Sequence, residues 1–286
     1  MEYLNPAPAP ILPQAMWLTY RVVMERPGLN ADEVLDLAVP TAMRGRTPSE
    51  GSHVKRALDG LQRLGLVQNE SGKVSAARVG AAEDFLRLLR RRIVSPPETF
   101  GAAFDVPEDL RRGLIWLTRQ APTKALNFEL DIEPTTSVFT NPTRWNIFRF
   151  WSDALGFSRP ALLTTMSADL RQAGSLVIPN PTGAVIDAIR APFGEPLPRG
   201  QQIPITRLVD FLREEIPVLP GHPSATYNGL TGKADEALRA LGLALTNAEE
   251  RQILDLTYQS DPSRVMALPD AHDGRPRYVS AVTIRK

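Results

Sequence analysis

The stretch from Asn30 to Ser75 decides the fold, and it reads NADEVLDLAVPTAMRGRTPSEGSHVKRALDGLQRLGLVQNESGKVS. Asn30 and Glu33 are spaced to cap the start of a helix, and Pro40 ends that helix. The segment from Thr47 to Glu50 is a second capping pattern, with proline at the first helical position. A backbone N–H at that position has no partner within the helix, so proline costs no hydrogen bond there. This stretch therefore predicts a helix, a turn and a second helix.

The second helix is amphipathic, and a hairpin follows it. Apolar residues recur every three or four positions, as one buried helix face requires. Segment 65–68 is typical of a strand, 69–72 of a turn and 73–75 of a second strand. Helices followed by a hairpin predict a winged helix-turn-helix, a module whose second motif helix enters the DNA major groove. The apolar residues of the helix are Val54, Ala57, Leu58, Leu61 and Leu64.

The outward side of this helix carries the polar residues that a DNA-reading helix would present. Lysine and arginine donate hydrogen bonds to guanine and to phosphate. Basic residues outnumber acidic ones by five to two in 41–63, and again by five to two in 78–92. Positive charge thus gathers where phosphates would lie. We predict that double-stranded DNA is contacted by Arg44, Arg46, Ser52, His53, Lys55, Arg56 and Lys73.

The same module also fits a protein-docking role. Glu50 lies in the first turn of the second helix, where its carboxylate would face phosphates. The turn from Val39 to Thr47 is longer than the usual three or four residues of a helix-turn-helix. We favour contact with DNA, and a protein-docking face remains the alternative.

Arginines and aromatic residues recur at helical spacing in two later segments. Trp145, Phe148 and Trp151 lie three positions apart, which would suit base stacking, but aromatics at this spacing usually form a core. We therefore favour the core. The earlier segment forms either a stripe along a duplex backbone or a solvated helix end, and its arginines are Arg87, Arg90, Arg91 and Arg92.

No part of the sequence points to catalysis, a cofactor or a metal. Cysteine is absent, so no disulfide, thiolate ligand or thiol nucleophile is available. Neither a GxxxxGK[ST] phosphate loop nor a GxSxG nucleophile elbow is present. His53, His222 and His272 have no partner at metal-ligand spacing. We expect a protein with no catalytic residues, no cofactor and no metal.

The chain is long enough for several modules, and its charge is balanced. It has 286 residues, with 33 Lys and Arg against 32 Asp and Glu and a formal net charge of +1. A whole-molecule electrostatic argument for nucleic acid therefore fails, and only local charge supports it. The N-terminus lacks the features of a signal peptide, and no apolar run approaches the roughly 20 residues that cross a bilayer. We expect a cytoplasmic protein without a membrane partner.

Twenty-six prolines divide the chain. We predict a winged helix-turn-helix domain over 1–95, a mainly helical central domain over 96–200 that resembles a degenerate winged helix, and a winged-helix-like domain over 201–286. The expected fold is mainly α with small antiparallel β-sheets, built from tandem winged modules. A faint repeat of an Ala-Leu…Leu-Gly-Leu pattern in 57–66 and 237–243 supports this architecture. Further helices are expected at 11–26, 81–93, 107–120, 141–155, 180–189, 205–216 and 231–241, and strands at 175–178, 254–258, 264–268 and 277–284.

Three short stretches carry a resemblance to a known family. They are Leu4 to Pro8, Leu64 to Val67, and Gln259 to Leu268 together with Tyr278 to Ser280. With the overall layout, they resemble the DpdG-like component of the bacterial system that places 7-deazapurines in DNA. The resemblance implies a non-catalytic DNA-binding subunit that acts beside a modification or restriction machine in anti-phage defence. It also implies other protein subunits of a defence complex as partners, and it supplies no catalytic residues.

Three functions are open on the sequence. The first is a DNA-binding accessory subunit of bacterial defence, and we favour it because helix caps, hairpin and positive flanks coincide. The second is a transcriptional regulator whose central region senses a ligand or forms a homodimer on a palindromic operator. The third is an interaction scaffold whose winged modules hold other proteins, without affinity for DNA.

Overall fold

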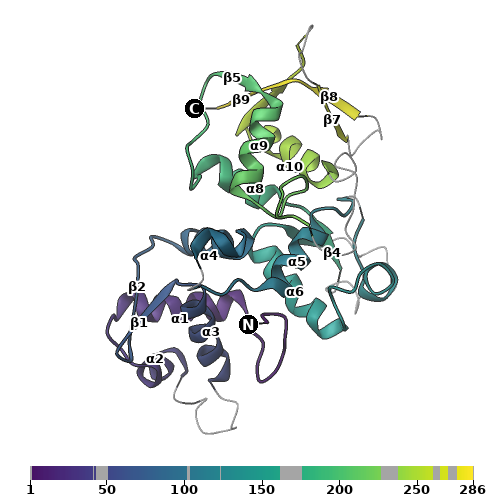
Figure 1. The fold of residues 1–286 in the computed structure, drawn as a ribbon. Helices are drawn as coiled ribbons and strands as arrows, with labels where there is room; N and C mark the ends of the chain where they lie inside the picture. Colours follow the sequence, from purple (N-terminus) through teal and green to yellow (C-terminus); the bar gives the residue numbers. More distant parts are fainter. Residues whose placement is uncertain are drawn as a thin grey trace. The chain divides into compact units, whose positions relative to one another are not determined.

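The computed structural model describes residues 2–40, 42, 51–101, 104–122, 124–161, 176–226, 238–259, 265–269 and 276–285 (Figure 1). The chain forms two compact units. Unit 1 comprises Met1–Arg111 and Thr136–Ala154, and unit 2 comprises Arg112–Thr135 and Leu155–Lys286. The predicted borders near residues 95 and 200 do not coincide with this division, and the organisation into three domains stays a prediction.

Unit 1 opens with three helices and a hairpin, in the predicted order. The helices are α1 (Pro13–Glu25), α2 (Ala31–Ala38) and α3 (Ser52–Arg63), and the antiparallel strands β1 (Val67–Glu70) and β2 (Lys73–Ala76) follow them (Figure 1). α1 packs against α3 because each helix presents one apolar face. The fully buried side chains of these two faces include Met16, Val23, Ala57 and Leu61.

The capping pair predicted at the start of α2 is confirmed. Asn30 Oδ1 accepts the backbone N–H groups of Asp32 and Glu33, each at 3.0 Å. In return, the Glu33 carboxylate accepts the Asn30 N–H at 2.8 Å. These bonds satisfy N–H groups that a helix start leaves without intrahelical partners.

α3 begins at Ser52, and glycine is required just before it. Gly51 has φ of 78°, a left-handed conformation that side chains rarely adopt. A Cβ on Gly51 would also clash with the side chain of Leu35 in α2. The close approach of the two helices therefore depends on this glycine. The capping pattern predicted over 47–50, together with Arg44 and Arg46, lies outside the described residues.

The hairpin turn is shorter than predicted. Glu70 pairs with Lys73, so only Ser71 and Gly72 form the turn, and their φ values are 54° and 84°. Two successive positive φ angles match the twist of a two-residue hairpin. Asn69 and Glu70, expected in the turn, therefore belong to β1. On the other edge of β2, Leu29 pairs antiparallel with Val74.

The rest of unit 1 surrounds an aromatic core. Its elements are α4 (Ala82–Val94), the 3-10 turn η2 (Pro97–Phe100), the first turn of α5 (Glu108–Leu117) and α6 (Pro142–Ala154). Trp145, Phe148 and Trp151 of α6 are at most 1% exposed. The Phe139 ring lies 5.2 Å from that of Trp145 and 4.7 Å from that of Phe148. The core interpretation of these aromatics is confirmed.

Unit 2 combines short helices with three small antiparallel sheets among the described residues. The first sheet consists of β3 (Ser158–Pro160) and β4 (Val177–Pro179). The second consists of β5 (Gln202–Pro204), β9 (Ala281–Ile284) and β6 (Leu254–Thr257), with β9 in the middle. The third consists of β7 (Met266–Pro269) and β8 (Pro276–Val279). No helix in the described part of the chain is long and apolar enough to cross a membrane. The helical elements are the rest of α5, η3 (Phe128–Ile132), α8 (Thr182–Arg190), α9 (Ile205–Glu215) and α10 (Arg239–Glu250).

One order of elements and strand pairings occurs three times along the chain. After α1, Leu29 pairs with β2, which also pairs with β1. After α5, Leu126 pairs with β4, which also pairs with β3. After α8, β5 pairs with β9, which also pairs with β6. In each case the strand that comes last in sequence lies between the other two in the sheet. Two helical elements separate the first two pairing segments in sequence: α2 and α3 in the first case, η3 and α6 in the second, and α9 and α10 in the third.

Residues 239–241 of the predicted helix over 231–241 are helical, but its predicted end at Leu241 and the sequence repeat based on that end are wrong. α10 runs from Arg239 to Glu250 and passes through Gly242, whereas Gly65 ends α3 with φ of 66°. The two Leu-Gly-Leu patterns therefore occupy different positions. The reason is that apolar residues continue beyond Gly242 on the buried face of α10, namely Ala244, Leu245 and Ala248. Residues 231–237 lie outside the described residues.

Candidate nucleic-acid interface

α3 has one buried face and two polar flanks. Because α-helical residues advance by about 100° each, His53, Arg56 and Gly60 share one flank. Lys55, Asp59 and Gln62 share the opposite flank by the same geometry. The buried face between them packs in unit 1 through Val54, Ala57, Leu58 and Leu61.

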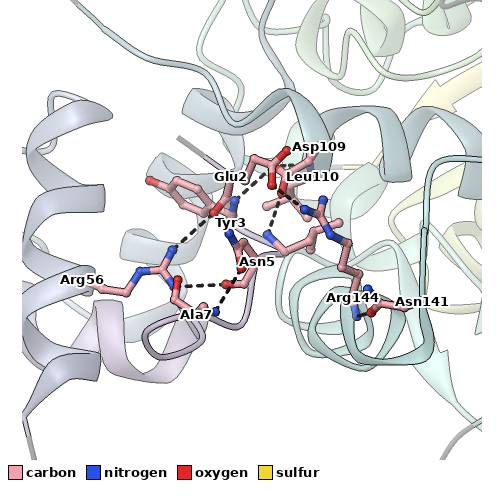
Figure 2. Close-up of polar contacts among 10 residues, drawn as sticks. Glu2, Tyr3, Asn5, Ala7, Arg56, Asp109, Leu110, Asn141 and Arg144 are labelled. Atoms are coloured by element: carbon pink, nitrogen blue, oxygen red, sulfur yellow. Dashed lines mark hydrogen bonds and ion pairs between the residues drawn. The ribbon is translucent and has the colours of Figure 1, made fainter. Parts of the chain in front are cut away.

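The N-terminal strap, residues 2–11, is bound to the first flank of α3 (Figure 2). Arg56 donates from Nη1 to the backbone carbonyls of Asn5 at 3.0 Å and Ala7 at 2.9 Å, and also to that of Ala9. Its Nη2 lies 3.5 Å from the carbonyl of Glu2. Burial lowers the pKa of Arg56. The guanidinium thus satisfies carbonyls along most of the strap.

Tyr3 and Leu4 fix the start of the strap. The Tyr3 hydroxyl donates to the Gly60 carbonyl at 2.9 Å, and burial raises the pKa of Tyr3. Backbone N–H groups of Tyr3 and Leu4 donate to the two carboxylate oxygens of Asp109, at 3.1 and 2.7 Å (Figure 2). Burial raises the pKa of Asp109, although the hydrogen bonds from backbone N–H groups act in the opposite direction.

α6 holds both ends of the strap. Arg144 forms an ion pair with Glu2 (Figure 2). The Trp151 indole donates from Nε1 to the Ile11 carbonyl at 2.9 Å. Leu4 and Ile11 are 0% exposed, so the strap is an integral part of the core of unit 1.

The structure separates the predicted DNA-binding residues into distinct environments. His53 Nδ1 lies 3.0 Å from the Pro10 carbonyl, so His53 joins Arg56 beside the strap. Ser52 Oγ is buried and has no hydrogen-bond partner in the described part of the chain. Lys55 on α3 and Lys73 on β2 are exposed. The predicted contacts of all seven residues with DNA stay predictions. Of the five that the structure describes, Lys55 and Lys73 are the exposed lysines.

Charge on the second flank of α3 is partly neutralised. Arg63 Nε lies 3.1 Å from Asp59 Oδ1, and Arg63 Nη1 lies 3.3 Å from Asp105 Oδ2. The hydrogen bond and charge of Asp59 raise the pKa of Arg63. Lys55 shares this flank with the carboxylate of Asp59, and Arg63 is ion-paired, so the local excess of positive charge is small.

The arginines of α4 form neither an exposed stripe nor a solvated helix end. Arg90 is only 7% exposed. The Arg92 guanidinium lies over two aromatic rings, 4.1 Å from the centroid of Phe100 and 5.1 Å from that of Phe104. Arg87 pairs with Asp84 at 2.9 Å. Burial of Arg90 interrupts the predicted stripe, and the ring contacts of Arg92 show that the helix end is not simply solvated. Contact of these arginines with a duplex stays a prediction.

Histidine and acidic side chains do not gather into a metal site in the described residues. His222 Nδ1 lies 2.7 Å from Ser224 Oγ, in a loop of unit 2. His272 lies outside the described residues. The described side chains therefore offer hydrogen bonds and charge for recognition, and none of them is arranged to hold a metal ion.

Sequence reasoning missed the strap. Three prolines between residues 6 and 10 suggested a stiff lead, and nothing local indicated what it packs against. The available signal was the apolar set Tyr3, Leu4 and Ile11, which is unusual in a solvated segment. Its partners Arg56, Asp109 and Trp151 are distant in sequence.

Comparison with known proteins identifies one family. The family model described as DpdG-like matches residues 1–262 of the chain. The matched region includes the strap, α3, the β1–β2 hairpin and α10. No curated protein and no solved structure matches the chain.

Proposed function

Because the chain belongs to the DpdG-like family, we propose that it is a non-catalytic, DNA-binding accessory subunit of a bacterial DNA modification or anti-phage defence system. It acts in the cytoplasm beside the other protein subunits of that system. The family membership supports the setting in DNA modification. The role within that setting is argued from the arrangement of unit 1.

The repeated strand pairing supports a winged-helix assignment. A winged helix-turn-helix has two motif helices followed by a hairpin wing. In the first module α2 and α3 are the motif helices, and the small sheet consists of Leu29, β2 and β1. The same pairing around β4 and around β9 extends the assignment to tandem modules. On this interpretation, α3, α6 and α10 are equivalent third helices.

α3 is the best candidate among these helices for contact with DNA. The exposed Lys55 on α3 and Lys73 on the wing are the observation that carries the proposal. α10 is almost entirely apolar or acidic after Arg239, and its exposed end is Glu250. Duplex DNA therefore contacts the N-terminal module through α3 and its wing.

Charge reversal on α3 and the wing tests this proposal. We expect the Lys55→Glu and Lys73→Glu double variant to bind duplex DNA at least about tenfold more weakly at low salt, because two phosphate contacts become repulsive. Fluorescence anisotropy with the full chain measures this, on duplexes with and without modified bases. Arg207→Glu is the matched control, since Arg207 is exposed on α9. Equal binding by the double variant and the wild type would remove the proposal.

A protein scaffold is the second candidate, and one observation favours it. Arg56 and His53, two of the expected DNA contacts, lie against the strap. The cations that remain exposed around α3 are few. On the scaffold hypothesis, the wild type shows no saturable binding to any duplex at low salt, and the modules hold protein subunits instead.

A further inference from the structure

A cationic pocket lies in unit 2, at the C-terminal ends of α8 and α10. Its volume is about 250 Å³. Three isoleucines, from the end of α8, the turn after α10 and the end of β9, supply its apolar surface. The polar lining is Arg190, Arg199, Arg251, Gln252 and Arg285. No carboxylate lines the pocket among the described residues.

The turn after α10 presents Arg251 without using its side chain as a helix cap. Gln252 has φ of 59°. Its N–H donates to the Glu249 carbonyl at 2.8 Å, and the Ile253 N–H donates to the Ala248 carbonyl at 2.9 Å. These are the two bonds of a Schellman motif, which satisfy the last carbonyls of a helix from the backbone alone. The Arg251 guanidinium is therefore not needed for that purpose.

On the opposite wall of the pocket, backbone pairing with β9 holds Arg199 in place. Arg199 pairs with Ile284 of β9, and the next residue, Gly200, donates its N–H to the Ile284 carbonyl at 2.8 Å. Arg199 Nη2 donates to the carbonyl of Arg190 at 3.3 Å. This bond uses one of the five N–H donors of the guanidinium and fixes its position.

The four guanidinium groups are poorly balanced by acidic groups. Of the four arginines in the pocket, Arg285 is the one that forms an ion pair with a carboxylate among the described residues, and its Nε donates to both Asp255 oxygens at 3.0 and 2.9 Å. Asp255 raises the pKa of Arg285. Cations that share a pocket repel one another, and an anion relieves that repulsion. A guanidinium matches the paired oxygens of a phosphoryl group, which it binds with two parallel hydrogen bonds.

We propose that this pocket binds a phosphoryl anion, with Arg190, Arg199 and Arg251 as its principal ligands. The chemistry fits inorganic pyrophosphate, a nucleotide, or the terminal phosphate of a nucleic-acid strand. The site is separate from α3 and does not depend on the proposed contact of α3 with duplex DNA. Gln252 adds an amide at the rim, which can donate to a phosphate oxygen.

Titration calorimetry of the full chain with pyrophosphate tests the site. We expect saturable binding by the wild type and a loss of at least about tenfold in affinity for the Arg190→Gln and Arg251→Gln double variant, because two charge-assisted contacts are removed. The matched control is Arg207→Gln with Arg239→Gln, which removes two exposed arginines of unit 2 that do not line the pocket. Arg251→Lys keeps the charge and loses the forked geometry, so it should bind with intermediate affinity.

Two further ligands distinguish the sources of the phosphate. One is a single-stranded oligonucleotide with a 5′-phosphate compared with its 5′-hydroxyl form, and the other is a nucleoside triphosphate. A preference for the 5′-phosphate that the double variant loses indicates a strand end. Binding of pyrophosphate and nucleotide with equal affinity for both oligonucleotides indicates a free anion. The proposal is overturned if no phosphate ligand binds, or if the double variant binds pyrophosphate as tightly as the wild type does.

Discussion

Arg56 is the residue whose role depends most on its surroundings. On the sequence it is an outward cation of a DNA-reading helix, whereas in the structure it donates to several backbone carbonyls of the strap. Prolines at positions 6, 8 and 10 lack N–H donors, and the strap forms no strand pairing within the described residues. Its carbonyls therefore need side-chain donors, and a guanidinium offers five in one plane.

We predict that Arg56→Gln destabilises unit 1 by about 1–2 kcal/mol, since partly buried and exposed carbonyls of the strap lose a charged donor. Urea denaturation measures the loss, and hydrogen exchange should rise first at residues 3–9 of the strap. Lys55→Gln is the control because it lies one residue away and is exposed. It should change the free energy of unfolding by less than about 0.5 kcal/mol. Equal effects of the two substitutions would contradict the role assigned to Arg56.

Single residues were predictable where the signal was local. Asn30 and Glu33 lie three positions apart, and that spacing alone indicates the capping bonds that form. Trp145 and its neighbours follow the helical period, which indicated their burial. The environments of Arg56 and Arg90 were not predictable, because the groups that cover them are brought in by tertiary packing. Exposure cannot be read from a polar residue's own helix alone.

At the scale of elements, strand pairing is the feature that sequence conceals. Leu29 and Leu126 each make a single-residue pairing with the last strand of their segment. No alternation of apolar and polar residues can mark a strand of that length. The helices were better predicted, because α1, α4, α8 and α9 each show an apolar face of several turns. The helix predicted over 231–241 was ended too early, because α10 continues through Gly242 to Glu250.

Glu249 joins α10 to two strands and gives a pH-dependent prediction. Burial would raise its pKa, but hydrogen bonds from Arg277 and from the Leu256 N–H outweigh burial and lower it. A lowered folded-state pKa means that this stabilisation is complete above the ordinary value of 4.5 and is lost as the pH falls through the folded-state pKa.

We therefore predict that, on acidification below pH 4.5, the free energy of unfolding falls less steeply for the Glu249→Gln variant than for the wild type. Above that pH, the variant should be less stable by about 1 kcal/mol, because an amide replaces the charged partner of Arg277. Urea midpoints across this pH range measure both effects. Glu250→Gln, on the exposed neighbour of Glu249, is the control. A difference between wild type and Glu249→Gln that does not shrink on acidification would contradict the assignment.

The whole molecule has almost no net charge, so the proposed contact with DNA must be local. Lys and Arg number 33 against 32 Asp and Glu. Several of the arginines that seemed to form a basic surface are ion-paired, buried or stacked on rings. The expected contact is consequently small, with Lys55 and Lys73 in the described residues and Arg44 and Arg46 outside them.

The salt dependence of duplex binding measures the size of that contact. The logarithm of the binding constant falls with the logarithm of salt concentration with a slope of about −0.9 for each phosphate contact, so four contacts give a slope near −4. Between about 50 and 200 mM salt, affinity should then fall by roughly a hundredfold. The Lys55→Glu and Lys73→Glu double variant should lose about two units of that slope. A slope near −8 would instead require phosphate contacts beyond these four residues, and no measurable binding at the lowest salt would favour a scaffold that holds only proteins.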